Sequence, residues 1–117
     1  MDTNRPALVL HRHRSVENDA LRELLLGMEE EGVPVRMVPS GELNPLELAA
    51  AAALESRLGV GIGVSLDYVV VTTEKLPAGR PYIARRFNAD AAQDRTVGAN
   101  AARLVKRLPL FHYPTAR

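Results

Sequence analysis

Apolar residues along this chain alternate between short continuous runs and runs with helical spacing. The run from Ala7 to Leu10 suits a buried strand, and the run from Val35 to Val38 suits a second one. Between them, apolar residues at i, i+3, i+4 and i+7 predict a helix that begins at Asn18 or Asp19 and ends near Glu31. The apolar residues of that helix are Leu21, Leu24, Leu25 and Met28.

Glycine, proline and asparagine predict where the first two helices begin and end. Gly32 stands where a left-handed residue commonly follows a helix, and Pro34 prevents the helix from continuing. Asn44 is a good N-cap, and Pro45 suits the first position of a second helix. We expect Gly59 to close that helix.

The rest of the chain predicts three strands and a last helix. The β-branched runs 60–64 and 68–72, separated by 65–67, are typical of a hairpin. Residues 81–87 favour another strand, and 91–108 favour a helix. The order strand, helix, strand, helix, three strands, helix predicts an α/β fold in a single domain over residues 1–117, with a mixed, partly parallel sheet of about five strands and about three helices packed on it.

Composition narrows the class of protein. The chain is 46% hydrophobic and 25% charged, which is typical of a globular domain, and it has no cysteine for a disulfide or a thiol nucleophile. No apolar run approaches the roughly 18 residues that a membrane span needs. The polar start, residues 1–5, lacks a signal-peptide pattern, so we expect a cytoplasmic protein without membrane contact.

Charge is distributed unevenly along the chain. The net charge is only +1, which gives no support for nucleic acid as a partner. Residues 1–78 hold 7 basic and 12 acidic side chains, whereas residues 79–117 hold 8 basic and 2 acidic ones. Such polarity concerns partners rather than the fold.

Catalytic chemistry finds little support. His11 and His13 could hold a metal, but a strand-end loop with two histidines is more often a solvated turn, and further ligands are missing. The glycines in 59–63 have the wrong spacing for a dinucleotide loop and lie within a strand pattern, where glycine more often marks the close approach of another backbone. We therefore expect no enzyme.

The end of the first helix carries three consecutive glutamates, Glu29 to Glu31. They lie at the negative end of the helix dipole, where each exposed carboxylate costs about 0.3–1 kcal/mol at low salt. At about 100° per residue, Glu30 falls nearly opposite the apolar face, and Leu26 points outward beside Arg22. Two interpretations stay open: a partner-binding face, or a solvated glutamate run beside one exposed leucine.

The last helix has a basic side and a row of small residues. Arg95, Arg103 and Lys106 share its outer side, and small residues within 98–102 permit close approach of a neighbour. We favour a solvated basic face beside a packing seam over a partner-binding face.

Two segments resemble a known protein family. Residues 24–34 resemble the leucine–glycine–isoleucine–triple-glutamate–glycine–isoleucine–proline segment in the small subunit of diol and glycerol dehydratase reactivating factors. Residues 98–106 resemble a second segment that the family shares near its C-terminus. The weaker segments 59–62 and 75–77 follow in matching order, so the resemblance covers nearly the whole chain. Met28 stands where isoleucine is more usual in the family.

The resemblance implies a chaperone-like function. In that family, an ATPase large subunit and a non-catalytic small subunit release damaged cobalamin from an adenosylcobalamin-dependent diol or glycerol dehydratase. The small subunit leaves, and the large subunit then takes hold of the dehydratase medium subunit through the same kind of surface. ATP or ADP and magnesium act on the large subunit, so this chain alone is expected to bind no cofactor. A bacterial microcompartment is one cytoplasmic location that fits.

One site carries over from the family. The middle glutamate of the triple, Glu30, is expected to contribute to a metal ion, Mg²⁺ or a similar divalent ion, shared with the large subunit. Arg22, Leu26 and Glu29 are expected to accompany it in the partner interface. When its partner is absent, the same surface could bind a second copy of the chain.

Two rival functions stay open. The dehydratase medium subunit shares both segments, although it normally carries an N-terminal extension, so chain length favours the reactivating factor. A small nucleotide-binding α/β domain would depend on the glycines in 59–63. The identity of the diol substrate is beyond the reach of the sequence.

Overall fold

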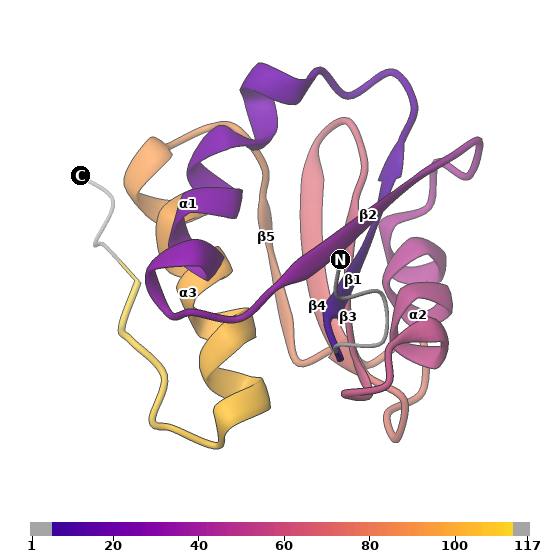
Figure 1. Cartoon of the computed structure of the whole chain (residues 1–117). Helices are drawn as coiled ribbons and strands as arrows, with labels where there is room; N and C mark the ends of the chain where they lie inside the picture. The colour runs from indigo at the N-terminus through magenta and orange to yellow at the C-terminus, as the bar shows by residue number, and fades with distance from the viewer. Residues whose placement is uncertain (1–5, 114–117) are drawn as a thin grey trace.

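The computed structural model describes residues 6–113, and within them the predicted order of strands and helices is confirmed (Figure 1). The strands are β1 (Leu8–His13), β2 (Val35–Ser40), β3 (Val60–Val64), β4 (Tyr68–Thr73) and β5 (Ile83–Arg86). The helices are α1 (Arg22–Glu30), α2 (Pro45–Glu55) and α3 (Ala91–Lys106), and a 3-10 turn (Asn18–Leu21) precedes α1. No helix in this part of the chain is long and apolar enough to cross a membrane.

The five strands in the described residues form one mixed sheet in the order β2-β1-β3-β4-β5. The strand β1 pairs in parallel with both β2 and β3, whereas β3-β4 and β4-β5 are antiparallel. The predicted fold class is therefore confirmed, including the parallel first half and the hairpin.

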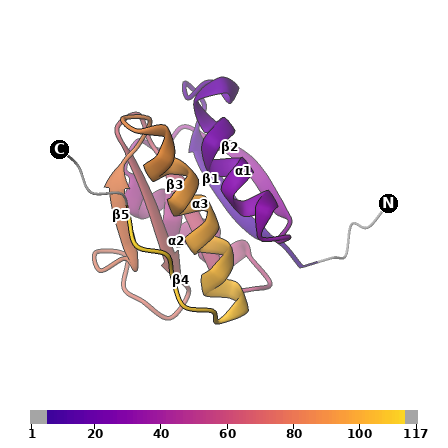
Figure 2. The same cartoon turned by 90° about the vertical axis from the view of Figure 1, so that its left-hand side faces the viewer.

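The helices cover the two faces of the sheet unequally. The helices α1 and α3 lie side by side on one face, and α2 lies alone on the other (Figures 1 and 2). The larger core lies under the helix pair and is aliphatic apart from Phe87, with Leu10, Leu24 and Ile62 at zero exposure.

Glycines let the helices approach very closely on both faces. A Cβ added at Gly61 would lie 2.1 Å from the backbone nitrogen of Ala53 in α2, so only glycine fits there. In the helix pair, a Cβ at Gly27 would lie 2.1 Å from the carbonyl oxygen of Arg95, and one at Gly98 would lie 2.0 Å from that of Leu24. The predicted close approach at the glycines of β3 and the predicted packing seam of the last helix are both confirmed.

The predicted end of the first strand is wrong. The strand β1 continues through His13, in parallel register with β2 as far as Ser40. It can continue because the side chain of His11 is buried under α2, with Nε2 2.9 Å from Oε2 of Glu55. The expected histidine loop is therefore part of a strand.

Two predicted helix ends also differ. Asn18 does not cap α1, because its side-chain oxygen accepts a hydrogen bond from the guanidinium of Arg12 instead. The helix α2 ends at Glu55 rather than at Gly59, because the next residue, Ser56, is extended and its hydroxyl donates to the carbonyl of Ala7 at 2.8 Å. The predicted cap at Asn44 is confirmed: its Oδ1 accepts from the amide of Leu46 at 2.9 Å.

Candidate functional site

The end of α1 is set by a tight left-handed turn. Gly32 has φ +76°, its amide donates to the carbonyl of Glu29 at 2.9 Å, and the amide of Val33 donates to that of Met28 at 3.4 Å. This pattern is the Schellman motif, which glycine favours because the left-handed region costs it no Cβ clash. The three glutamates therefore lie in the last turn of α1 and just after it, as predicted, at the negative end of the helix dipole.

Close packing at Gly27 and Gly98 brings basic residues of α3 within reach of these glutamates. The predicted solvated basic face is therefore wrong, because each of its three members pairs with a carboxylate of α1 or of the residue that follows it: Arg95 with Glu23 and Glu30, Arg103 with Glu31, and Lys106 with Glu31. The three glutamates of the triple consequently have three different environments.

Glu31 is clamped between two cations. Its carboxylate lies 3.4 Å from Nε of Arg103 and 3.1 Å from Nζ of Lys106, and its side chain is only 15% exposed. The hydrogen bond from Lys106 is the largest cause that lowers the pKa of Glu31 below its usual value. Together with the positive charges of Arg103 and Lys106, it outweighs the opposite effect of burial. Lys106 also donates to the backbone carbonyl of Glu31 at 2.7 Å. Glu31 therefore joins the two helices.

Glu30 faces solvent, as predicted, but it is not without a partner. Its side chain is 58% exposed, and its Oε2 lies 3.4 Å from a terminal nitrogen of Arg95. The same guanidinium lies closer to Glu23, with Nε 3.1 Å from Oε1. The carboxylate of Glu30 thus shares one cation with a second carboxylate and keeps most of its surface open.

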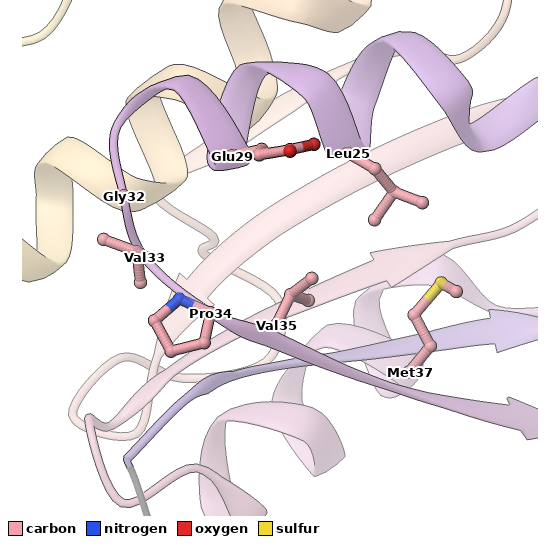
Figure 3. Close-up of a pocket in the computed structure, with 7 residues that line it drawn as sticks. All are labelled: Leu25, Glu29, Gly32, Val33, Pro34, Val35 and Met37. Atoms are coloured by element: carbon pink, nitrogen blue, oxygen red, sulfur yellow. The ribbon is translucent and has the colours of Figure 1, made fainter. Parts of the chain in front are cut away.

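Glu29 is exposed and stands at the rim of a groove (Figure 3). Within residues 6–113, its carboxylate makes no ion pair. The groove has a volume of about 440 Å³ and lies between α1 and the edge strand β2. Figure 3 shows Leu25, Val35 and Met37 on its two sides, and its other lining residues are Gly32, Val33 and Pro34.

The two remaining candidate interface residues differ in exposure. Arg22 is exposed, and its side chain has no hydrogen bond or ion pair in the part of the chain that the structure describes. Leu26, which the sequence predicts to point outward as an exposed leucine, is half-buried, so its side chain is only partly open to solvent. The structure thus places all four candidates on α1, with Glu29 and Glu30 in its last turn and Arg22 in its first.

The described residues do not form a metal centre by themselves. No group of three or more histidine or carboxylate side chains within 6–113 is arranged to hold a metal ion. The two histidines of β1 have separate partners: His11 lies against Glu55, and Nδ1 of His13 accepts from the amide of Ser15 at 3.1 Å. The glycines of β3 leave no room for a phosphate on the α2 side, because the helix backbone fills that space.

Sequence reasoning missed Asn100, which fastens the segment after α3. The side chain of Asn100 has no exposure; its Nδ2 donates to the carbonyl of Phe111 at 3.0 Å, and its Oδ1 accepts from the amide of Phe111 at 2.7 Å. Arg103 stacks on the ring of Phe111 at 3.9 Å, and the segment returns along α3 toward β5 (Figure 2). The signal in the sequence was an amide beside the buried stripe of the last helix.

Asp94 is a second missed residue. It is 2% exposed in the first turns of α3, and its carboxylate accepts from the amide of Asn88 at 3.1 Å. Burial raises the pKa of Asp94 to about 6, although the hydrogen bond from Asn88 works in the opposite direction. The nearby charges of Asp90 and Glu23 contribute to this raised pKa.

Comparisons with known proteins agree with the resemblance over almost the entire chain. The family model described as dehydratase medium subunit matches residues 5–111. The propanediol dehydratase-reactivating factor small subunit of Citrobacter freundii is 38% identical over 104 residues, which is 89% of each chain. The solved glycerol dehydratase reactivase is 37% identical at a TM-score of 0.86, covering 92% of this chain and 98% of that one. The solved diol dehydratase-reactivating factor complexed with ADP and Mg²⁺ is 35% identical at a TM-score of 0.87, and the match covers 93% of this chain and 100% of that one.

Proposed function

Because the chain belongs to the dehydratase medium subunit family, together with small subunits of diol and glycerol dehydratase-reactivating factors, we propose that it is the non-catalytic small subunit of such a factor. Its partner would be an ATPase large subunit, and the pair would release damaged cobalamin from an adenosylcobalamin-dependent dehydratase. The observation that carries the proposal is the likeness to reactivating factors along nearly the full length of both chains. The place of action would be the cytoplasm, including a bacterial microcompartment.

The large subunit would cover the outer side of α1. The proposed interface consists of Arg22, Leu26, Glu29 and Glu30. Its support is physical: two exposed carboxylates lie at the negative end of a helix dipole, and one of them has no ion pair within the described residues. A partner that brings positive charge to this end would relieve that unfavourable arrangement.

Glu30 would supply one carboxylate oxygen to a divalent ion, Mg²⁺ or a similar one, held mainly by the large subunit. The residues fit this limited role, because a hard cation prefers oxygen ligands and this carboxylate is more than half exposed. The described residues, 6–113, do not fit the role of a complete metal site, because they contain no group of three possible ligands. When bound, the ion would link the two subunits electrostatically. ATP or ADP would bind the large subunit only.

Release of cobalamin would proceed by exchange of subunits. The small subunit would leave the large subunit, whose freed surface would then hold the medium subunit of the dehydratase and loosen that enzyme. The shared family supports this proposal, because a medium subunit with the same fold could present a surface like that of α1.

A second candidate is the medium subunit of the dehydratase itself, which the description of the family model favours. The two functions differ in their partner. The full chain should be mixed with an ATPase-type large subunit and, separately, with the other dehydratase subunits, and co-elution should be measured for each mixture. Recovery of the activity of inactivated dehydratase should then be measured in the presence of ATP and Mg²⁺. We expect a complex with the ATPase and recovery of activity. Assembly into active dehydratase, or binding of ATP by the isolated chain, would contradict the proposal.

A further inference from the structure

Arg95 is shared between two carboxylates of α1 through different nitrogen atoms. Its Nε lies 3.1 Å from Oε1 of Glu23, and its terminal nitrogen lies 3.4 Å from Oε2 of Glu30. The Glu23 contact is the shorter one and belongs to the better-covered carboxylate, which is 35% exposed against 58% for Glu30. The contact with Glu30 can therefore break while the contact with Glu23 persists.

This arrangement conflicts with a metal ion at Glu30 unless something moves. A divalent cation on Oε2 would stand within a few ångströms of the guanidinium charge, and like charges at such distances repel strongly even near a protein surface. Arginine cannot relieve the repulsion by losing its proton, because its pKa is too high. The guanidinium must leave Glu30, and Glu23 offers it a position nearby.

We propose that Arg95 is an internal counter-ion of Glu30 that the partner's divalent cation displaces, and that Glu23 retains the guanidinium during this exchange. The inference rests on the proposed function, which brings the cation to Glu30. In the free chain, Arg95 holds the Glu30 carboxylate in place and offsets part of its charge. On association, the cation replaces Arg95, so the strength of the Arg95–Glu30 contact sets how much Mg²⁺ the complex requires.

Glu31 shows why the middle glutamate, and not the one after it, suits this exchange. Two cations hold Glu31, and its side chain is 15% exposed, so a metal ion would have to displace both Arg103 and Lys106. The single, longer contact at Glu30 is easier to break and opens onto solvent.

The test is the Mg²⁺ concentration at half-maximal association of the full chain with the large subunit, measured for Arg95→Gln and Glu23→Gln. Arg95→Gln removes the competitor and should lower that concentration about two- to fivefold, the range expected for an exposed ion pair. Glu23→Gln removes the alternative position of the guanidinium, leaves it to Glu30 and should raise the concentration by a similar factor. Lys106→Gln removes a charge from the same helix but contacts Glu31, and should leave the Mg²⁺ requirement unchanged.

The outcomes separate this inference from the proposed function. If Arg95→Gln raises the Mg²⁺ requirement, Arg95 only positions Glu30. If neither variant shifts the requirement, Arg95 has no part in metal binding. Either result overturns the exchange but leaves the proposed function standing, as long as the wild-type complex still depends on Mg²⁺. A wild-type chain that does not associate with the large subunit would overturn the proposed function and the exchange together. Melting temperatures of the variants, measured alongside, show that each one is folded.

Discussion

On both faces of the sheet, glycines allow a helix to pack closely, but the charged residues beside the two helices are arranged differently. On the α2 face, glycines of β3 admit an alanine-rich helix. Glu55, the last residue of that helix, places its side-chain carboxylate against His11 and Arg36. On the other face, Gly27 and Gly98 admit a second helix, and the seam is bordered by ion pairs that leave Glu29 and Glu30 open. The comparison indicates that α2 completes the fold, whereas α1 also keeps exposed carboxylates, which suits the partner surface that we propose for it.

The largest expected effects come from adding a Cβ on either face. Gly61→Ala and Gly98→Ala should each lower the free energy of unfolding by at least about 2 kcal/mol, because the new atom meets backbone that cannot move away. The two should differ in association, because the Cβ of Gly98→Ala meets the backbone of α1, which carries the proposed interface, whereas that of Gly61→Ala meets the backbone of α2. Chemical denaturation and binding to the large subunit check this, with Gly79→Ala as the control because its Cβ would meet open space. Equal loss of binding in both variants would remove the distinction between the faces.

Leu26→Asp tests the apolar part of the proposed interface. Leu26 is half-buried, so the variant should lose about 1 kcal/mol of folding stability and about 2 kcal/mol of association free energy with the large subunit. Leu54→Asp is the control for a charge outside the proposed interface, because Leu54 is 75% exposed and lies on α2, which covers the other face of the sheet. Titration calorimetry of both variants should show a loss for Leu26→Asp alone, and undiminished affinity there would exclude Leu26 from the interface.

Substitutions of Glu31 and Glu30 separate an effect on folding stability from an effect on association with the partner. Glu31→Ala should lower the free energy of unfolding by about 1 kcal/mol, because it breaks contacts with two cations of α3. Glu30→Ala should change stability by less than about 0.5 kcal/mol, because its ion pair is exposed, but it should weaken Mg²⁺-dependent association. Thermal unfolding and binding measured on both variants check the pair. A clear loss of melting temperature in Glu30→Ala would show that Glu30 is structural.

The smallest expected effect is a pH dependence of stability. The pKa of Asp94 is raised to about 6 from an ordinary 3.8, so the folded state holds this proton more tightly than the unfolded chain does. The group therefore lowers the free energy of unfolding as pH rises from about 4 to about 6, and Asp94→Asn should flatten this slope and gain about 0.5–1 kcal/mol at pH 7. The pKa of Glu31 is lowered, so its stabilising contribution is present above pH 4.5 and is lost as pH falls further. Urea unfolding at a series of pH values checks both, and an unchanged slope in Asp94→Asn would contradict the assignment.

The elements themselves were predictable because their signals are local. The bounds of β3 agree with the β-branched run 60–64, and Asn44 and Gly32 act at helix ends as predicted. Predictions failed where a side chain bonds a residue of another element: Asn18 accepts from Arg12 of β1 instead of capping α1, and His11 of β1 is buried against Glu55 of α2.

The outward position of Glu30 was predictable from the sequence, but the electrostatic environment of the three glutamates was not. A helical wheel puts Glu30 outward and gives the three glutamates equal standing. The difference between Glu30 and Glu31 depends on α3, whose cations lie more than 60 residues away in sequence. Only the position of α3, which Gly27 and Gly98 determine together, shows that Arg95 holds the carboxylate that the family resemblance marks as a metal ligand.

The most direct test of this account compares the two helices by hydrogen exchange. The full chain should be measured alone and with the large subunit and Mg²⁺. We expect slower amide exchange in residues 22–31 on association and no change in Pro45–Glu55 of α2. Protection of α2 with unchanged exchange in 22–31 would contradict the assignment of the outer side of α1 as the partner surface.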